Sequence, residues 1–353
     1  MKSDKLTIYD IAKLAGVSTT TVSRVINNNG YVSKEKRELV LQVIEEKKYR
    51  PNAVAQSLST SMSRTIGMLV PDVRNAFYST LFSTLEKEAL KYDYNVILCN
   101  YSNNNEITMK QCDMLLKKQV DVILQVGGPS DLYEIPQEQL DIYAEINKRV
   151  PVVTTGKLQG SDFYSVGIDD SYAIDAALRD MYAKGHRKFV IAGGSSRYIP
   201  TRSKQEQFTK TLTELGIPEK DRIVFDYDNF DQYGGIKSIE ILLENEPVPP
   251  TVFMGINEAF AIGMENELIR RGFKIPQDAS VIGFDNTYLS DFVIPELSCI
   301  GCDYEEYAEA LMKTILGIAS GKCPLGTGSR GHFFESYVQS RFVVRKSTGV
   351  LEK

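Results

Sequence analysis

Histidine and cysteine are scarce in this sequence of 353 residues. It contains two histidines and five cysteines. Two histidines leave little for acid–base catalysis, and the sequence has neither the GxSxG motif of serine hydrolases nor the GxxxxGK phosphate loop. An odd number of cysteines in a long chain is typical of reduced thiols rather than of a disulfide framework. We therefore expect a protein that is not an enzyme.

One pair of cysteines, Cys299 and Cys302, has the spacing of a metal-binding or redox motif. A structural zinc site would need a second such pair or nearby histidines, and the two histidines are His186 and His332. A single pair of cysteines at this spacing is a weak signal, so we expect no metal and no cofactor. A metal or redox role for this pair stays open as the alternative.

Long apolar stretches are also missing. No apolar run reaches 18 residues, and the first residues are not typical of a signal peptide. We expect a soluble, cytoplasmic protein without a membrane partner. The chain is longer than a usual single domain, which predicts two or three domains, and its 42% hydrophobic residues suffice for buried cores.

Positive charge is concentrated in the first 64 residues, although the net charge of the chain is −5. Residues 1–64 hold eleven Lys and Arg against six Asp and Glu, and the rest of the chain holds 30 against 40. The first part therefore carries +5 and the remainder −10. This distribution predicts that affinity for phosphates lies at one end of the chain, although a solvated surface helix can also be basic.

The strongest local pattern lies in residues 6–31, LTIYDIAKLAGVSTTTVSRVINNNGY. Apolar residues at helical spacing predict a short helix capped by Thr7 and a second one capped by Ser18. Gly16 supplies the turn between them, because glycine adopts a left-handed backbone cheaply. A third helix is predicted from Ser33. This pattern is typical of a helix-turn-helix whose second helix reads DNA, and an ordinary helical hairpin is the alternative.

Polar side chains cover the outward side of the second predicted helix. Small hydroxyls, one amide and one guanidinium suit base edges and phosphates in a major groove. These residues are Thr19, Thr20, Thr21, Ser23, Arg24 and Asn27. The small polar stretch that follows residue 50 is either a loose linker or a short helix that orders on DNA. In the second case Leu58 would insert into a minor-groove step and kink the duplex.

These motifs resemble the lac repressor and galactose repressor family of bacterial transcription regulators. The resemblance rests on LTIYDIAKLAGVSTTTVSRVINNNGYVS, YRPNAVAQSL and IGMLVPDVRNAFY, and later blocks extend it over nearly the whole chain. It implies a DNA-binding domain in residues 1–50 and a hinge helix with linker in residues 51–61. It also implies that Thr19 and Thr20 read bases. The residues that would hold phosphates or support docking are Thr7, Ser18, Thr21, Ser23, Arg24 and Asn27. The hinge residues that would contact DNA are Asn52, Ala55, Gln56 and the intercalating Leu58.

From residue 62 onwards, short apolar runs alternate with helical patterns. The runs predict parallel strands at 65–70, 94–100, 120–126, 150–156, 188–194, 222–227, 251–256 and 280–285. The helices predicted between them are 77–92, 106–118, 137–148, 171–184, 203–215, 233–245 and 258–271. This alternation predicts βαβ units, and its two series predict two doubly wound α/β lobes like those of periplasmic binding proteins.

The lobes are expected to exchange chain segments. We expect an N-terminal lobe of residues 62–163 plus 300–325 and a C-terminal lobe of residues 164–299 plus 326–345. The chain would then cross between the lobes near 162–166, 297–303 and 323–335, and three crossings make a hinge.

Residues that directly follow the predicted strands are candidates for an effector site, because ligands of such sheets bind outside the carboxyl ends of the strands. Amides, a carboxylate, cations and aromatic rings there would suit a polyol or sugar, whose hydroxyls need donors and acceptors and whose ring faces stack on aromatics. Each residue is as well explained as a turn group at a strand end. The candidates are Asn75, Phe77, Tyr78, Gly127, Tyr198, Arg202, Lys204, Asn229, Asn257 and Asp285.

The family resemblance sharpens three of these assignments. Asn257 and Asp285 match positions where the family commonly hydrogen-bonds effector hydroxyls. Lys204 stands where the family usually has arginine, and lysine keeps the charge but loses the bidentate fork. The two cations Arg202 and Lys204 slightly favour an acidic or phosphorylated sugar as the effector. A surface helix with salt bridges explains the same two residues equally well.

The sequence therefore predicts a sequence-specific DNA-binding regulator, a repressor of a carbohydrate-utilisation operon that a sugar or sugar derivative controls. The expected partners are double-stranded palindromic operator DNA, the small-molecule effector and a second copy in a homodimer, with helix 77–92 in the interface by family resemblance. One alternative is a global carbon-catabolite regulator that responds to a phosphorylated protein. The alternative from another class is a sugar-binding transport or sensor protein, which would carry an export signal and no basic first part.

Overall fold

The computed structural model of the chain describes residues 6–26, 30–49, 62–102, 104–156, 163–321 and 335–351. The chain divides into two compact units, Met1–Arg64 and Thr65–Lys353, which we call the head and the core. Within the described residues, no helix combines the length and the apolar character that a membrane span needs.

The described residues of the head form three short helices, α1 (Ile8–Leu14), α2 (Thr19–Ile26) and α3 (Lys34–Glu46). Gly16 makes the turn between the first two with a φ of +61°, as the sequence predicts. The apolar side chains of the three helices meet in a small core of Ile11, Ala12, Ala15, Val22, Val25, Val40 and Val43.

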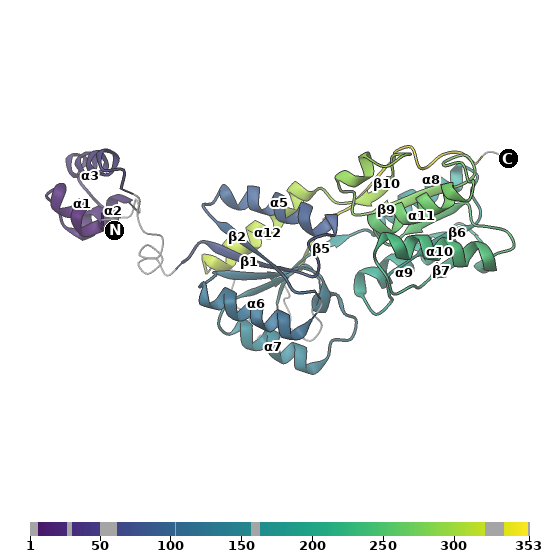
Figure 1. Ribbon diagram of the computed structural model, residues 1–353, viewed down its shortest axis with the longest axis horizontal. Helices are drawn as coiled ribbons and strands as arrows, with labels where there is room; N and C mark the ends of the chain where they lie inside the picture. The colour runs from purple at the N-terminus through teal and green to yellow at the C-terminus, as the bar shows by residue number, and fades with distance from the viewer. Residues whose placement is uncertain are drawn as a thin grey trace. The chain divides into compact units, whose positions relative to one another are not determined.

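The first lobe of the core is a parallel sheet with helices on both faces. Its strands are β1 (Thr65–Val70), β2 (Asn95–Asn100), β3 (Val122–Gln125), β4 (Val152–Thr154), β5 (Tyr164–Asp169) and β11 (Glu335–Gln339), in the spatial order β11-β5-β4-β3-β1-β2. Its helices are α5 (Ala76–Leu90), α6 (Asn105–Lys117), α7 (Gln137–Asn147) and α12 (Tyr304–Ala319). Helices α5 and α12 pack together on one face of the sheet, and α6 and α7 cover the other (Figure 1).

The second lobe repeats this plan. Its strands are β6 (Phe189–Ala192), β7 (Arg222–Phe225), β8 (Val252–Gly255), β9 (Ser280–Phe284), β10 (Ser298–Gly301) and β12 (Arg341–Val343), in the order β12-β10-β9-β8-β6-β7. Its helices are α8 (Ser171–Ala183), α9 (Ile199–Glu214), α10 (Gln232–Asn245) and α11 (Glu258–Arg270). Helix α8 packs with α9 and α10 with α11, and β12 runs antiparallel to β10.

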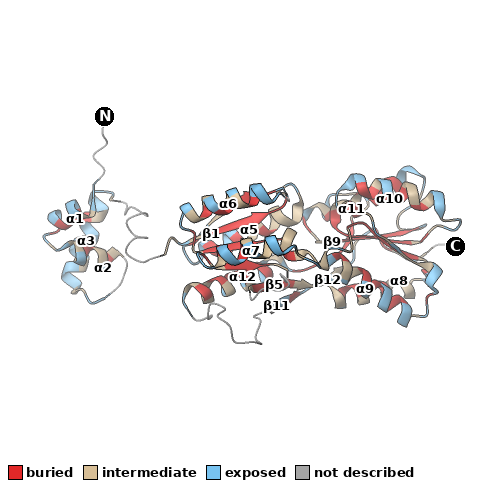
Figure 2. Cartoon of the chain, turned by 90° about the horizontal axis from the view of Figure 1, so that it is seen from below, coloured by how far each residue is buried: buried red, intermediate tan, exposed pale blue. Residues whose placement is uncertain are grey.

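Burial explains why the strands read as apolar runs. Strands β3, β4, β6, β8 and β9 are buried along their whole length, because helices cover both faces of each sheet. In Figure 2 the inner strands of the sheets are red, while the helices are buried on one side and exposed on the other. The two doubly wound parallel-sheet lobes that the sequence predicts are confirmed.

The expected lobe boundaries are wrong at two places. Strand β5, expected in the C-terminal lobe, pairs with β4 in the first sheet. Strand β11, also expected in the C-terminal lobe, pairs with β5, and only β12 of the closing segment joins the second sheet. The chain therefore crosses between the lobes after Asp169, after Gly301 and at Ser340. The sequence pattern of a strand next to a crossing is the same in either sheet, and only the pairing partner decides its lobe.

Candidate functional site

The first helix of the head begins with a capping box. The Thr7 backbone N–H donates to Asp10 Oδ2 over 2.8 Å, and the Asp10 N–H donates to Thr7 Oγ1 over 3.4 Å. The Thr7 hydroxyl also donates to Asp10 Oδ2 over 2.7 Å, and these bonds lower the pKa of Asp10. Thr7 thus lies at the positive end of a helix, where a phosphate is favoured.

The second helix is held at its start by Ser18 and Thr21. Ser18 Oγ accepts the Thr21 N–H over 3.2 Å and lies 2.9 Å from Thr21 Oγ1. Val22 and Val25 of the same helix are buried in the head core. The inward valines leave the opposite side of α2 toward solvent, with Thr20 and Arg24 exposed and Thr19 and Ser23 half-buried.

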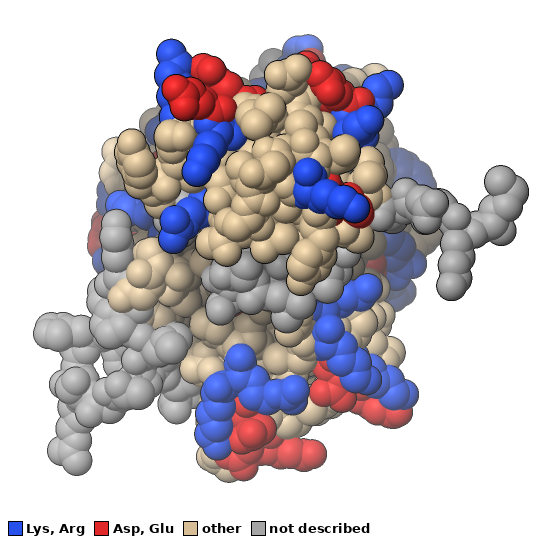
Figure 3. Space-filling view, turned by 90° about the vertical axis from the view of Figure 1, so that its left-hand side faces the viewer, with Lys and Arg blue, Asp and Glu red and all other residues tan. Residues whose placement is uncertain are grey.

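Charged side chains of both signs occur on the side of the molecule drawn in Figure 3, where Lys and Arg are blue and Asp and Glu are red. On α2 the only formal charge is that of Arg24, and the other outward groups are hydroxyls. Such a surface suits base edges in its middle and a phosphate at its end.

Several residues predicted to contact DNA lie outside the described residues, as does the whole hinge segment 51–61. They are Asn27, Asn52, Ala55, Gln56 and Leu58. Their roles stay predictions.

In the first lobe, three predicted effector residues come together, two of them after β1 and Gly127 after β3. Phe77 and Tyr78 occupy the first turn of α5, with their rings edge to face at 5.3 Å. A Cβ added to Gly127 would lie 2.9 Å from the Tyr78 hydroxyl, and Gly127 has a φ of +65°. Glycine is therefore required beside this phenol. Burial raises the pKa of Tyr78, and the nearby carboxylates of Asp131 and Asp285 raise it further.

In the second lobe, Tyr198 and Arg202 lie at the start of α9. The Tyr198 ring packs edge to face on Phe230 at 5.6 Å. The Arg202 guanidinium lies 3.7 Å from the ring centroid of Tyr133 in the first lobe, and its Nε donates to the Ser196 carbonyl over 3.1 Å. Arg202 therefore helps to join the lobes through a cation–π contact.

Lys204 is the most enclosed of the predicted cations, with 12% of its side chain exposed. Its Nζ lies 3.6 Å from Asp170 Oδ2, donates to the Ile256 carbonyl over 3.3 Å and stands 4.0 Å from the centre of the Phe284 ring. The charge of Lys204 is thus already partnered within the second lobe.

The predicted asparagines act as turn and cap residues. The side-chain oxygens of Asn75, Asn229 and Asn257 accept backbone N–H groups from Phe77, Asp231 and Phe260 over 2.9, 2.7 and 2.8 Å. Asn257 Nδ2 also donates to the Phe230 carbonyl over 2.8 Å. The side-chain oxygens of these asparagines therefore stabilise turns and helix starts, as the turn-group alternative predicts. A ligand could use only those amide hydrogens that have no partner within the protein.

Two enclosed carboxylates lie near Lys204, one from each lobe. Burial raises the pKa of Asp285 to about 6 and that of Asp131 to about 7, and the positive charge of Lys204 lowers both. The sequence predicts Asp285 but not Asp131. Asp131 follows the double glycine after β3, within the short 3-10 helix η1 (Gly128–Asp131), and applying the strand-end rule a few residues further would have found it.

The two lobes touch through specific contacts around these residues. The Tyr133 N–H donates to the Arg197 carbonyl over 2.8 Å, and the Tyr304 hydroxyl donates to the Asp285 carbonyl over 3.0 Å. The Tyr304 ring also lies 6.0 Å from that of Phe77. Tyr304 was not predicted, because strand β10, which it follows, was taken for a crossing segment.

The Cys299–Cys302 pair is buried in the core. Burial raises the pKa of both thiols to about 12, and Cys299 Sγ lies 3.0 Å from Ser290 Oγ. Within the described ranges, no three His, Cys, Asp or Glu side chains group in a way that could hold a metal ion. Protonated thiols are poor nucleophiles and poor metal ligands, so this geometry does not favour a metal or redox role.

A helix-turn-helix head followed by two doubly wound lobes that meet around aromatic and carboxylate side chains defines a class: DNA-binding regulators with a periplasmic-binding-protein-like core. Residues 7–52 match the family "Bacterial regulatory proteins, lacI family", and residues 63–299 match "Periplasmic binding proteins and sugar binding domain of LacI family". The chain belongs to the lacI family of bacterial transcription regulators, and it is a DNA-binding regulator. The match over the head separates it from transport proteins with similar lobes.

Among curated relatives, the chain is 35% identical to catabolite control protein A of Priestia megaterium over 298 residues, 84% of this chain and 87% of that protein. It is 31% identical to the HTH-type transcriptional repressor PurR of Glaesserella parasuis serovar 5 over 312 residues, 88% and 89% of the two chains. These relatives are transcription regulators rather than enzymes.

Solved structures share the fold. The lac repressor dimer bound to operator and the anti-inducer ONPF superposes with a TM-score of 0.79 at 23% identity, covering 98% of this chain and 99% of that one. A LacI-family regulator from Enterococcus faecium with bound ribose gives 0.68 at 24% identity, covering 82% and 100%. The CelR–cellobiose complex gives 0.67 at 20% identity, covering 97% and 99%.

Proposed function

We propose that this regulator is a repressor that binds a palindromic operator as a homodimer, and that an uncharged sugar or polyol held between the two lobes controls its affinity for DNA. The observation that carries the proposal is the convergence, from both lobes, of aromatic rings with carboxylates and one lysine. Rings of Phe77, Tyr78 and Tyr304 come from the first lobe, and those of Tyr198 and Phe230 from the second.

A sugar suits this set of groups. Its apolar ring faces stack on aromatic side chains, and its hydroxyls both donate and accept hydrogen bonds. Asp131 and Asp285 supply acceptors, Lys204 supplies a donor, and Asn75 and Asn229 keep their amide hydrogens. The related solved proteins with ribose and cellobiose support the same class of ligand.

The charges favour an uncharged ligand over the acidic or phosphorylated sugar toward which the sequence leans. Lys204 already faces Asp170, and the carboxylates of Asp131 and Asp285 lie near it. Arg202 is turned to the ring of Tyr133. An anionic effector would meet at least as much negative as positive charge, and removing that charge from water would cost affinity.

Linkage between the ligand and DNA follows from the contacts that join the lobes. A ligand that binds one lobe arrangement better than another shifts the equilibrium by that difference in affinity. The Tyr133–Arg197 and Tyr304–Asp285 hydrogen bonds are made in the arrangement seen here. We propose that this arrangement is the one an effector stabilises, and that it changes how the hinge segments support DNA binding.

Exposed apolar side chains support the homodimer. Tyr288, Phe292 and Ile294 stand close together in the chain between β9 and β10, with 59, 79 and 90% of their surfaces exposed. A cluster of this kind is typical of an interaction surface. In the apolar stripe of helix α5, Leu81 and Leu85 are buried within the lobe, whereas Leu90 is 62% exposed.

The experiment is a titration of duplex operator, selected from a random pool, with the protein in the presence of single compounds. A panel of neutral sugars, sugar acids and sugar phosphates should contain a neutral sugar that changes the operator Kd by about tenfold or more, within the usual range of allosteric coupling. Asp285→Asn should lose that response and keep the operator Kd measured without sugar. The proposal fails if calorimetry detects a neutral sugar bound to the core while the operator Kd stays constant.

A regulator that responds to a phosphorylated protein remains the second candidate. It is supported by the 35% identity to catabolite control protein A. The same titration with phosphorylated and unphosphorylated partner proteins in place of sugars separates the two mechanisms.

A further inference from the structure

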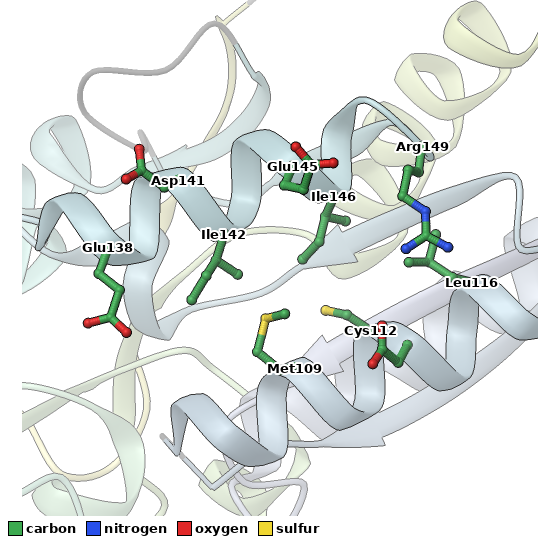
Figure 4. A pocket seen from close by; sticks show the side chains of 10 residues that line it. Met109, Cys112, Leu116, Glu138, Asp141, Ile142, Glu145, Ile146 and Arg149 are labelled. Atoms are coloured by element: carbon green, nitrogen blue, oxygen red, sulfur yellow. The ribbon is translucent and has the colours of Figure 1, made fainter.

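A groove of about 530 Å³ lies between helices α6 and α7, on the face of the first sheet that α5 and α12 do not cover. Its floor is formed by Met109, Cys112 and Leu116 of α6 and by Ile142 and Ile146 of α7. In Figure 4 the apolar side chains of the two helices point toward one another across the groove, while the charged groups stand around them. None of these residues belongs to the head or to the set between the lobes.

The rim of the groove is acidic. Its charged residues are Asp113, Glu138, Asp141, Glu145 and Arg149, which makes four carboxylates against one guanidinium, and Glu145 pairs with Lys148 over 2.8 Å. All five are exposed. An apolar floor inside an acidic rim complements a ligand that is apolar in its middle and basic at its flanks.

The shape of the groove favours a helix over a small molecule. Pockets for small ligands bury most of the ligand surface, whereas this groove is open and its floor residues Met109, Leu116 and Ile142 are only half-buried. From Glu138 to Glu145 the rim follows α7 for about 10 Å, at 1.5 Å per residue. This length matches about two turns of a docked helix, and a groove between two helices is a common binding site for an amphipathic helix.

We propose that the α6–α7 groove binds an amphipathic helix of a partner protein, with apolar side chains over Met109, Leu116 and Ile142 and with Lys or Arg beside Glu138 and Asp141. The contact adds an interaction surface to those proposed for DNA, the effector and the second copy of the chain. It would let another protein act on the regulator without competing for any of them.

The test uses the intact regulator and a labelled synthetic peptide of 14 residues, with Leu at helical positions i, i+3 and i+7 and Lys on both sides of that stripe. Fluorescence anisotropy should show saturable binding that weakens as salt is added. The double variant Glu138→Gln with Asp141→Asn should weaken binding about tenfold or more. A peptide of the same length with Glu in place of every Lys should not bind.

Matched variants distinguish peptide binding in the groove from non-specific attraction to the acidic core. Glu106→Gln removes a carboxylate on α6 that pairs with Lys110 over 2.6 Å and does not line the groove, and it should leave the peptide Kd within about twofold. Met109→Lys and Ile142→Lys should each abolish binding while thermal unfolding and the operator Kd stay as in the wild type. If one of them unfolds the protein, the other and the charge variants carry the test.

Three results overturn the proposal. They are the absence of saturable peptide binding, equal binding by the Glu-containing peptide, and equal loss of binding in Glu106→Gln and in the groove variants.

Discussion

Glu265 is a carboxylate with no obvious role, and its burial has a measurable consequence. It lies on α11 with 2% of its surface exposed, and within the described residues its Oε1 has no hydrogen-bond partner. Burial raises its pKa to about 8. The native state therefore holds this proton more tightly than the unfolded chain, in which a glutamate titrates near its ordinary value.

We predict that Glu265→Gln makes the regulator more stable than the wild type at alkaline pH but not at acidic pH. Because the native pKa is raised, the wild type loses unfolding free energy as pH rises from about 5 to about 8, and the variant lacks that loss. Urea unfolding of both proteins at pH 5 and at pH 8.5 measures the difference. A difference between the two proteins that does not change with pH contradicts the assignment.

Arg24 and Thr20 offer a second test at the level of single residues. Both are exposed on α2, and we expect Arg24 to contact a phosphate and Thr20 a base. Arg24→Ala should weaken binding to all duplexes and reduce the slope of log K against log salt by about one. Thr20→Ala should leave that slope unchanged and reduce the preference for operator over random duplex.

Anisotropy titrations of operator and random duplex over a series of salt concentrations measure both quantities. The assignment is wrong if Thr20→Ala changes the salt slope and Arg24→Ala changes only the sequence preference.

Some of the residues that lie between the lobes could be predicted from the sequence. Asp285 and Tyr78 follow strands that are strongly apolar, so the strand-end rule finds them. What each group does there could not be predicted, because a hydrogen bond depends on distances that the sequence does not contain. Asn257 illustrates this, since its amide is used by Phe260 and Phe230. Arg202 is also turned to Tyr133, a partner from the other lobe.

At the level of elements, helix caps can be compared directly. Asn257 caps α11 and is 7% exposed, and Asn104 caps α6 by accepting the Ile107 N–H over 3.0 Å at an exposed position. We predict that Asn104→Ala lowers the free energy of unfolding by about 1 kcal/mol, the usual value of a cap. Asn257→Ala should lower it by about 2 kcal/mol, because the hydrogen bond from the Asn257 amide to the Phe230 carbonyl is lost together with the cap.

Urea denaturation measures both changes. Equal losses in the two variants would show that the bond from Asn257 to the Phe230 carbonyl contributes nothing.

Elements with a strong pattern were predicted, and those at the edges of the lobes were not. Buried strands such as β3 and β8 are continuous apolar runs because helices cover them on both sides. Strand β11, with the sequence ESYVQ, lies at the edge of the first sheet, where polar side chains are common. Such a strand has no clear periodicity, so its sheet is decided by long-range pairing.

For the whole molecule, the Tyr304 hydroxyl makes one of the contacts that join the lobes. It donates from the first lobe to the Asp285 carbonyl in the second, whereas the Tyr307 hydroxyl donates to the Val166 carbonyl within the first lobe over 2.9 Å. We predict that Tyr304→Phe weakens effector binding several-fold, because it removes a contact made in the lobe arrangement that we propose the effector stabilises. Tyr307→Phe should lower stability and leave effector affinity unchanged.

Calorimetric titration with the effector found in the operator assay, together with small-angle scattering of the core, measures both outcomes. A similar loss of effector affinity in both variants would mean that general destabilisation, rather than the position of the lobes, is responsible.

The sequence by itself determined the parts that depend on local patterns. Helical spacing of apolar residues with a glycine at the turn specifies the head, and alternating apolar runs and helical patterns specify two doubly wound lobes, because burial and backbone geometry act over a few neighbouring residues. The tertiary structure alone decided which sheet β5 and β11 join, that Asp131 and Asp285 come close to one lysine, and that a groove opens between α6 and α7. These features arise where segments distant in the chain meet, and the free energy of such contacts depends on positions that no single segment specifies.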